Sequence, residues 1–149
     1  MSRLGAAVHI VTTDGPAGKA GFTATSVCSV SDDPPTLLVC LNRRSRITPL
    51  LHRNGVLCVN TLAAGEAPIA DVFAGRTGHF MERRFETGAW TVLKSGSPVL
   101  EAAIVALDCR VVEVKSVATH NVFFAIVEAI RRRPHVPALI YQDRTYKHV

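Results

Sequence analysis

Extended runs rich in apolar and β-branched residues recur along this chain, and in the run 104–114 apolar residues alternate with polar ones as in a half-buried β-strand. Extended segments of this kind are predicted at 6–13, 20–31, 36–42, 56–62, 104–114, 122–130 and 138–141. Turn-forming residues separate them, among them Asp14-Gly15-Pro16 and Asp32-Asp33-Pro34-Pro35. The pattern therefore predicts a mainly β protein.

Helical spacing is confined to two short segments, 47–53 and 66–73, and the second ends before Gly75. The polar, Gly-punctuated stretch 75–88 is predicted to be a loop with one helical turn. Because strands and helices do not alternate as βαβ units, a Rossmann sheet is not expected. A small, closed, mainly antiparallel barrel with helical insertions fits the order better.

The segment 122–130 is apolar on both faces, which is typical of a strand covered from both sides. One face can pack into the barrel, and the other needs a second surface. We therefore expect a homodimer in which this face of the barrel is buried against another subunit.

A chain of 149 residues fits one domain, spanning 1–149. The composition, 48% hydrophobic and 19% charged, excludes a disordered or low-complexity protein. No apolar run approaches the ~18 residues of a membrane span, and the first residues lead into no signal-peptide core. We therefore expect a cytoplasmic protein with no membrane partner.

All four cysteines lie in apolar runs and none forms a Cys-x-x-Cys pair. They are expected to be buried, reduced core thiols, and no metal site is predicted. The four are Cys28, Cys40, Cys58 and Cys109.

Arginine dominates the net charge of +5, with clusters at 43–46 and 131–133. A general nucleic-acid binder usually interleaves longer basic runs with exposed aromatic residues, whereas only 6% of this chain is aromatic. The charge is better matched to a small phosphorylated ligand or to solubility, and it does not by itself choose between them.

The motifs of several enzyme classes are absent. The chain has no Gly-x-Gly-x-x-Gly turn, no Walker sequence, no Gly-x-Ser-x-Gly elbow and no His-Glu-x-x-His helix. Its carboxylates are scattered, with no pair placed for glycosidic chemistry. If the protein is an enzyme, a cofactor is therefore expected to carry the difficult chemistry.

One strand carries an unusual number of hydroxyl groups, at Thr23, Thr25, Ser26 and Ser29. It is either an ordinary strand with an exposed hydroxyl-bearing face or a ligand wall that a flat ring can approach closely. The next strand ends at 42–46 just before a predicted helix, which Ser45 could cap, and helix-start amides bind phosphate well. The functional interpretation of the two segments is a nucleotide-like pocket.

Three long runs, 5–13, 21–31 and 34–42, resemble the short-chain flavin reductases, the reductase partners of two-component flavin monooxygenases such as the 4-hydroxyphenylacetate and pyrimidine-degradation systems. Shorter matches at 57–60, 73–75, 81–85, 119–120 and 139–141 extend the resemblance over nearly the whole chain. It implies a homodimeric split β-barrel of the Greek-key, FMN-binding type. It also implies FMN or FAD as flavin, NADH or NADPH as electron donor, and a monooxygenase that receives reduced flavin.

The resemblance also implies roles for individual residues. Those expected at the flavin ring and its ribityl chain are Ala24, Thr25, Ser26, Val27, Cys40, Leu41 and Asn42, with Asn60 as a polar neighbour. Ser45 and Arg46 match the phosphate-binding turn, Phe73 matches a position on the side where the nicotinamide enters, and Tyr146 lies in the C-terminal stretch that closes this region. His120 is the candidate catalytic residue on that side, although a lone histidine between strands can equally be a hydrogen-bonded loop residue.

Two other functions are compatible with the same fold. The protein could keep its flavin bound and reduce another acceptor, such as a corrinoid or a ferric chelate. It could also be a non-catalytic FMN-binding protein. NADH oxidation with and without free flavin would separate these alternatives.

Overall fold

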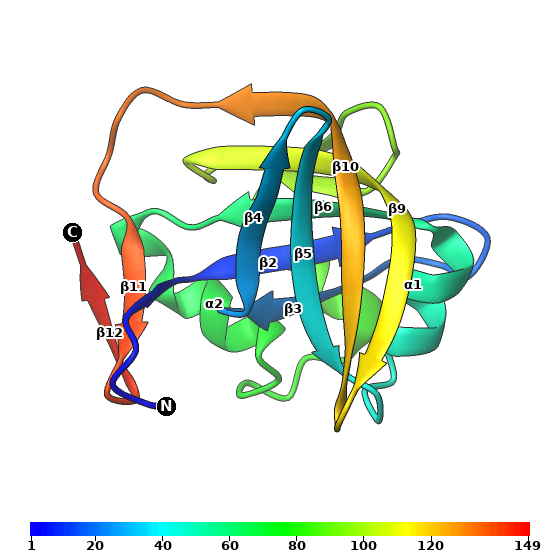
Figure 1. Cartoon of the computed structure of the whole chain (residues 1–149). Coiled ribbons are helices and arrows are strands. Elements are labelled where there is room, and N and C mark those ends of the chain that lie inside the picture. The colour runs from blue at the N-terminus through cyan, green and yellow to red at the C-terminus, as the bar shows by residue number, and fades with distance from the viewer.

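The computed structural model describes all residues 1–149 and shows a mainly β protein (Figure 1). Its strands are β1 (Ala6–Ala7), β2 (His9–Thr13), β3 (Ala20–Ala24), β4 (Val27–Asp32), β5 (Pro35–Asn42), β6 (Val56–Thr61), β7 (Trp90–Val92), β8 (Pro98–Leu100), β9 (Val105–Val117), β10 (His120–Arg132), β11 (Leu139–Gln142) and β12 (Thr145–His148). Its helices are α1 (Thr48–Asn54) and α2 (Ala67–Phe73), with 3₁₀ segments η1 (Ala64–Glu66) and η2 (Met81–Glu86). None of the helices has the length and apolar character needed to cross a bilayer.

Seven strands form one antiparallel sheet in the order β3-β2-β6-β9-β10-β5-β4. The sheet curls on itself, so that β2, β3 and β6 cross behind β4, β5 and β10 (Figure 1). The long strands β9 and β10 shift register between Phe124 and Ala125 and between Val127 and Ala129. Such bulges bend a strand and let it turn a barrel corner. The predicted antiparallel barrel is confirmed.

The two edges of this sheet are consecutive strands in the chain. β3 and β4 are joined only by Thr25 and Ser26, and they do not pair with each other. The Val27 amide donates to the Thr25 carbonyl at 3.0 Å, so the link is a tight bend. The single extended segment predicted at 20–31 was therefore wrong, because the chain crosses here from one sheet edge to the other. The barrel is therefore split at this link, as the resemblance implied, and the closed barrel expected from the order of elements was wrong.

The segment predicted as one strand at 6–13 also divides, at Val8. The backbone of Val8 bonds to Leu139 and Leu62, while β1 pairs with β11 in a separate small sheet. The hairpin β7–β8 and strand β12 were not predicted, because they are too short or too polar to show a period. The remaining predicted strands, both helices and the helical turn after residue 75 are confirmed.

The core has two main parts. The first fills the barrel and includes Val39, Leu51 and Phe123. The second lies where α2 and the C-terminal hairpin pack against the sheet, and includes Ile10 and Phe73. This second core holds α2 over β3, next to the split edge.

The cysteine prediction is half correct. Cys58 and Cys109 are buried, and burial raises the pKa of both thiols, that of Cys109 to about 12. Cys28, however, is exposed and Cys40 only half-buried. Both lie on the outward face of the β4–β5 pair. Neighbouring apolar residues in a strand alternate between its two faces, so they do not bury these two thiols within a single chain.

The histidine of β2 generates a test of the fold. His9 Nδ1 lies 2.9 Å from Thr61 Oγ1, and burial lowers the pKa of His9 to about 4. Between pH 6.5, the ordinary pKa of histidine, and about pH 4, His9 is protonated in the unfolded chain but not in the folded one. The free energy of unfolding therefore decreases as the pH is lowered through this window. The parent protein should lose about 2 kcal/mol more stability between pH 7 and pH 4.5 than His9→Gln, because the variant lacks this titrating group. Urea unfolding of both proteins at the two pH values measures this, and equal losses would contradict it.

Candidate functional site

Three cavities meet along β3. The central cavity, of about 470 Å³, is lined by Phe22, Thr23, Leu41, Ser45, Arg46, Ile47, Phe73, Ala74, Gly75, Gly78, His79, Phe80, Met81 and Arg84. The edge cavity, of about 230 Å³, is lined by Phe22, Thr23, Ala24, Thr25, Ser26, Cys40, Leu41, Asn42 and His120. The hairpin cavity, of about 180 Å³, is lined by Val8, Thr23, Thr25, Ala74, Arg76, Tyr141 and Tyr146. Because Thr23 borders all three, they form one groove beside the split edge of the barrel.

The wall of this groove is fixed by contacts between β3 and α2. The Thr23 hydroxyl donates to the Ala70 carbonyl of α2 at 2.6 Å. At Gly21, a Cβ would lie only 2.8 Å from the Phe73 ring, so glycine is needed for α2 to approach so closely. Small residues at 23–26 leave the backbone of the wall accessible to a flat ligand.

The turn after β5 is built by side-chain hydrogen bonds. Asn42 Oδ1 accepts from the Arg44 amide at 2.9 Å, and Thr48 Oγ1 donates to the Asn42 carbonyl at 2.8 Å. Ser45 does not cap α1 as predicted, because the capping position is Ile47 and Ser45 Oγ accepts the Ile47 amide at 3.2 Å instead. Ser45 thus shapes the turn three residues before the first residue of α1, where it lines the central cavity.

Charge around the groove has one sign. Arg46, Arg76 and Arg84 line its cavities, and no carboxylate does. Arg84 is held in place by the carbonyls of Gly21, at 2.9 Å, and Phe73, at 3.3 Å, and burial lowers its pKa. Guanidinium groups in fixed positions favour phosphate groups, with which they form charge-assisted hydrogen bonds.

The structure brings most of the predicted site residues together. The edge cavity gathers Ala24, Thr25, Ser26, Cys40, Leu41, Asn42 and His120, the central cavity gathers Ser45, Arg46 and Phe73, and the hairpin cavity contains Tyr146. Val27 does not line the groove, since its side chain packs against the barrel core.

Asn60 lies elsewhere, and its predicted position near a ligand is corrected. Its side chain is fully buried. The amide nitrogen donates to the Ile10 carbonyl at 3.1 Å, and Oδ1 accepts from the Leu100 amide at 2.8 Å. Asn60 therefore ties β2 to β8 inside the protein, where a polar group must be paired.

Two of the gathered residues differ in their access to a ligand. Phe73 is 1% exposed and packs edge-on against Phe85, so it forms the floor of the central cavity. His120 is exposed at the start of β10, opposite Asn42, with its Nδ1 2.8 Å from the Thr119 hydroxyl. No acidic side chain pairs with its ring.

Several lining residues were not predicted, notably Arg76, Arg84 and Tyr141. Two of them come from the loop 75–88, which has no hydrophobic period. The only signal in the sequence was three arginines between glycines in a loop that is otherwise polar.

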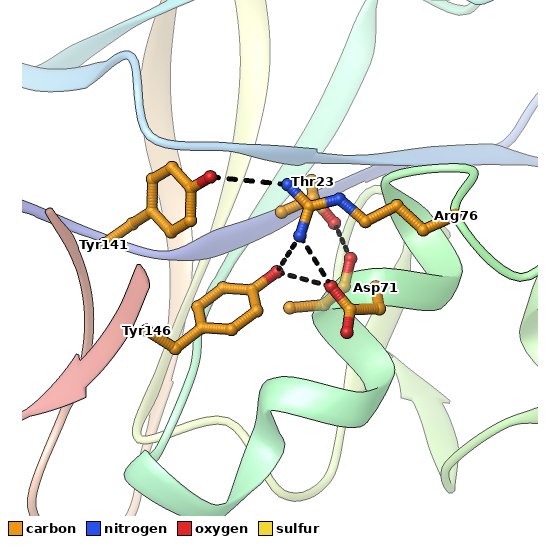
Figure 2. A network of polar contacts seen from close by, with 6 residues as sticks. Thr23, Asp71, Arg76, Tyr141 and Tyr146 are labelled. Carbon is orange, nitrogen blue, oxygen red and sulfur yellow. Dashed lines mark hydrogen bonds and ion pairs between the residues drawn. The ribbon is translucent and has the colours of Figure 1, made fainter. Parts of the chain in front are cut away.

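Arg76 joins a polar cluster between α2 and the C-terminal hairpin (Figure 2). Its Nη1 donates to Asp71 Oδ1 at 2.9 Å and to the Tyr146 hydroxyl at 3.4 Å, and its Nη2 donates to the Tyr141 hydroxyl at 3.4 Å. Tyr146 also donates to Asp71 Oδ1 at 2.9 Å, and burial together with this carboxylate raises the pKa of Tyr146 to about 12. The cluster attaches β12 to α2 through hydrogen bonds.

The comparisons with known proteins agree with this geometry. Residues 1–149 match the family described as flavin reductase like domain. The FMN reductase (NADH) RutF of Escherichia coli is 52% identical over 146 residues, covering 98% of this chain and 95% of the relative. A candidate flavin reductase structure from Haemophilus somnus has a TM-score of 0.94 and 43% identity, covering 100% of this chain and 94% of the other.

A further neighbour is the Streptomyces globisporus NADH:FAD oxidoreductase SgcE6, solved in complex with NAD and FAD fragments. It has a TM-score of 0.90 and 25% identity, covering 98% of this chain and 86% of that one. The split barrel, the arginine-lined groove and the match over the full length lead to one assignment: this chain belongs to the flavin reductase like family.

Proposed function

We propose that this protein is an NADH-dependent flavin reductase that reduces FMN or FAD and releases the reduced flavin to a partner monooxygenase. The observation that carries the proposal is the groove along β3, which combines a wall of small residues with three arginines and no carboxylate. The E. coli relative is named for FMN and NADH. BorF, 26% identical with a TM-score of 0.92 and covering 99% of this chain and 92% of its own, is the flavin reductase component of a two-component halogenase.

The residues of the groove would bind and orient two nucleotides. When both are bound, the nicotinamide supplies a hydride that the flavin accepts. The backbone of Ala24–Ser26 would contact the polar edge of the flavin, and Ser45 with Arg46 would hold its phosphate. No side chain has to move a proton to or from carbon, so the protein contributes mainly alignment and electrostatic stabilisation. This agrees with a groove that contains no paired acid and base.

Steady-state oxidation of NADH, with and without added FMN, tests the proposal. We expect turnover that saturates with free flavin. Turnover that needs a corrinoid or ferric chelate while the flavin stays bound would indicate the second function. Flavin binding with no turnover would indicate a non-catalytic protein. Either result would overturn the proposal.

The phosphate assignment predicts a selective loss of affinity. Replacing Ser45 and Arg46 together by alanine should weaken FMN binding at least tenfold, because a charged hydrogen bond contributes about 1.5–3 kcal/mol. Riboflavin lacks the phosphate and should bind the variant as it binds the parent protein. Fluorescence titration with both flavins measures this. Equal weakening would show that the two residues are structural.

His120→Ala is predicted to act on the electron donor. His120 is exposed and lines the edge cavity, so its loss should raise the KM for NADH or slow flavin reduction by a moderate factor. Flavin affinity should change little. Stopped-flow measurement of flavin reduction by NADH in the flavin-loaded variant tests this. An unchanged reduction rate with an unchanged dependence on NADH concentration would show that His120 is only a hydrogen-bonded loop residue.

We also propose that the protein is a homodimer in a reducing compartment such as the cytoplasm. Along β10, Phe123 and Ala125 point into the core, while Val122, Phe124 and Ile126 alternate with them and stay only half-buried. Phe124 lies beside Leu38 of β5, so the outward apolar surface spans neighbouring strands. The four free cysteines fit a reducing environment.

The dimer proposal predicts that Phe124→Asp converts a dimer into a monomer. The exposed Val92 of β7 lies in a separate small sheet, so Val92→Asp is the matched control and should stay dimeric. Light scattering at micromolar concentration, with circular dichroism to verify folding, measures both. A monomeric parent protein would contradict the proposal.

A further inference from the structure

The cluster around Arg76 does more than fasten the C-terminal hairpin. The hairpin cavity is bordered on one side by Thr23 and Thr25 of the flavin wall, and on the other by Arg76, Tyr141 and Tyr146. Arg76 is the only charged residue among those lining it. Any ligand that extends from the flavin wall into this cavity therefore meets one guanidinium and two aromatic rings.

The guanidinium of Arg76 is fixed and yet accessible. Asp71 and the two tyrosine hydroxyls accept its hydrogen bonds. Its Cζ lies 6.0 Å from the Tyr141 ring centre and 5.9 Å from that of Tyr146, within range of cation–π attraction. Its side chain nevertheless keeps 52% of its surface exposed. A side chain held only to attach the hairpin would not need this exposure beside a cavity.

The carboxylate of Asp71 faces the cluster and does not line the cavity. It accepts from Arg76 and Tyr146 through the same oxygen, Oδ1. Of this ion pair, only the positive partner lines the cavity. Asp71 can therefore fix the orientation of Arg76 without standing in the path of an anionic ligand.

We propose that Arg76, oriented by Asp71 and flanked by Tyr141 and Tyr146, binds the diphosphate of the nicotinamide donor. This inference rests on the proposed function. The flavin phosphate is assigned to Ser45 and Arg46 of the central cavity, and the flavin ring to the edge cavity. The hairpin cavity is then the remaining arm of the groove, and it adjoins the flavin wall where the nicotinamide must stack.

Arg76→Ala tests the proposal with two electron donors and FMN as acceptor. With NADH, loss of charge-assisted hydrogen bonds should raise the KM by about tenfold or more. The phosphate-free donor 1-benzyl-1,4-dihydronicotinamide should reduce flavin equally well with the parent and the variant. A purely structural role would slow both donors alike and would overturn the proposal, as would an unchanged KM for NADH.

Two controls complete the experiment. Arg83→Ala removes an exposed arginine of η2 that pairs only with Glu86, at 3.6 Å, and it should leave the KM for NADH unchanged. If Arg76→Ala fails to fold, Arg76→Lys keeps the charge but loses the planar fork, and should raise the KM for NADH with no effect on the phosphate-free donor. Equal effects of Arg76→Lys on both donors would overturn the proposal.

The FAD diphosphate is the competing occupant of the cavity. If Arg76→Ala raises the KM for FAD but not that for NADH, the cavity binds the flavin's adenylate arm and the proposal is wrong. If the parent protein fails to oxidise NADH when FMN or FAD is supplied as acceptor, the proposed function itself is refuted. That outcome differs from the outcomes that refute only the Arg76 assignment.

Discussion

The unpaired edges of β3 and β4 are the constraint on which the site depends. A sheet edge exposes backbone donors and acceptors that must be covered or used. Here Thr25 and Ser26 carry the chain from one edge to the other, and the edges stay apart. The edge cavity opens at this link, and Asn42 and His120 reach it from the neighbouring strands β5 and β10. The split therefore presents polar backbone to a ligand without an insertion or an extra domain.

Close packing behind the split makes the groove rigid. Gly21 lets Phe73 approach β3, and the Thr23 hydroxyl ties β3 to α2. Arg84 adds backbone contacts from the loop that follows α2. The guanidinium of Arg84 is thus held by carbonyl partners, so it needs little reorganisation when a phosphate group binds. Alignment of two nucleotides is the catalytic contribution that such a rigid groove can supply.

Much of this architecture could be predicted from the sequence. Strand β9 follows the alternation at 104–114, β5 and β10 follow continuous apolar runs, and both helices begin and end close to where the pattern indicates. The break at Thr25 and Ser26 could not be predicted from the pattern, because the residues on both sides of the bend are the same strand-forming mixture of Thr, Ser and Val. Ser45 lines the central cavity, but its predicted capping bond was wrong, since the helix begins three residues later with Pro49 in its first turn.

The site was predictable only as far as the resemblance extended. The wall at 24–26 and the turn at 45–46 are each short continuous segments, so each could be identified from its local sequence. Asn60 has the polar character of a site residue, but its neighbours Ile10 and Leu100 place it inside. Arg76 and Tyr146 are 70 residues apart and meet only through the fold. A contact of that kind has no local signature.

A crystal structure of the protein with FMN tests the central claim most directly. The claim is that the split edge of the barrel is the flavin site. The isoalloxazine ring should lie against Ala24–Ser26, with the phosphate within hydrogen-bond distance of Ser45 and Arg46. A flavin bound outside this groove, or one whose phosphate lies against another arginine cluster such as Arg131–Arg133, would contradict the account.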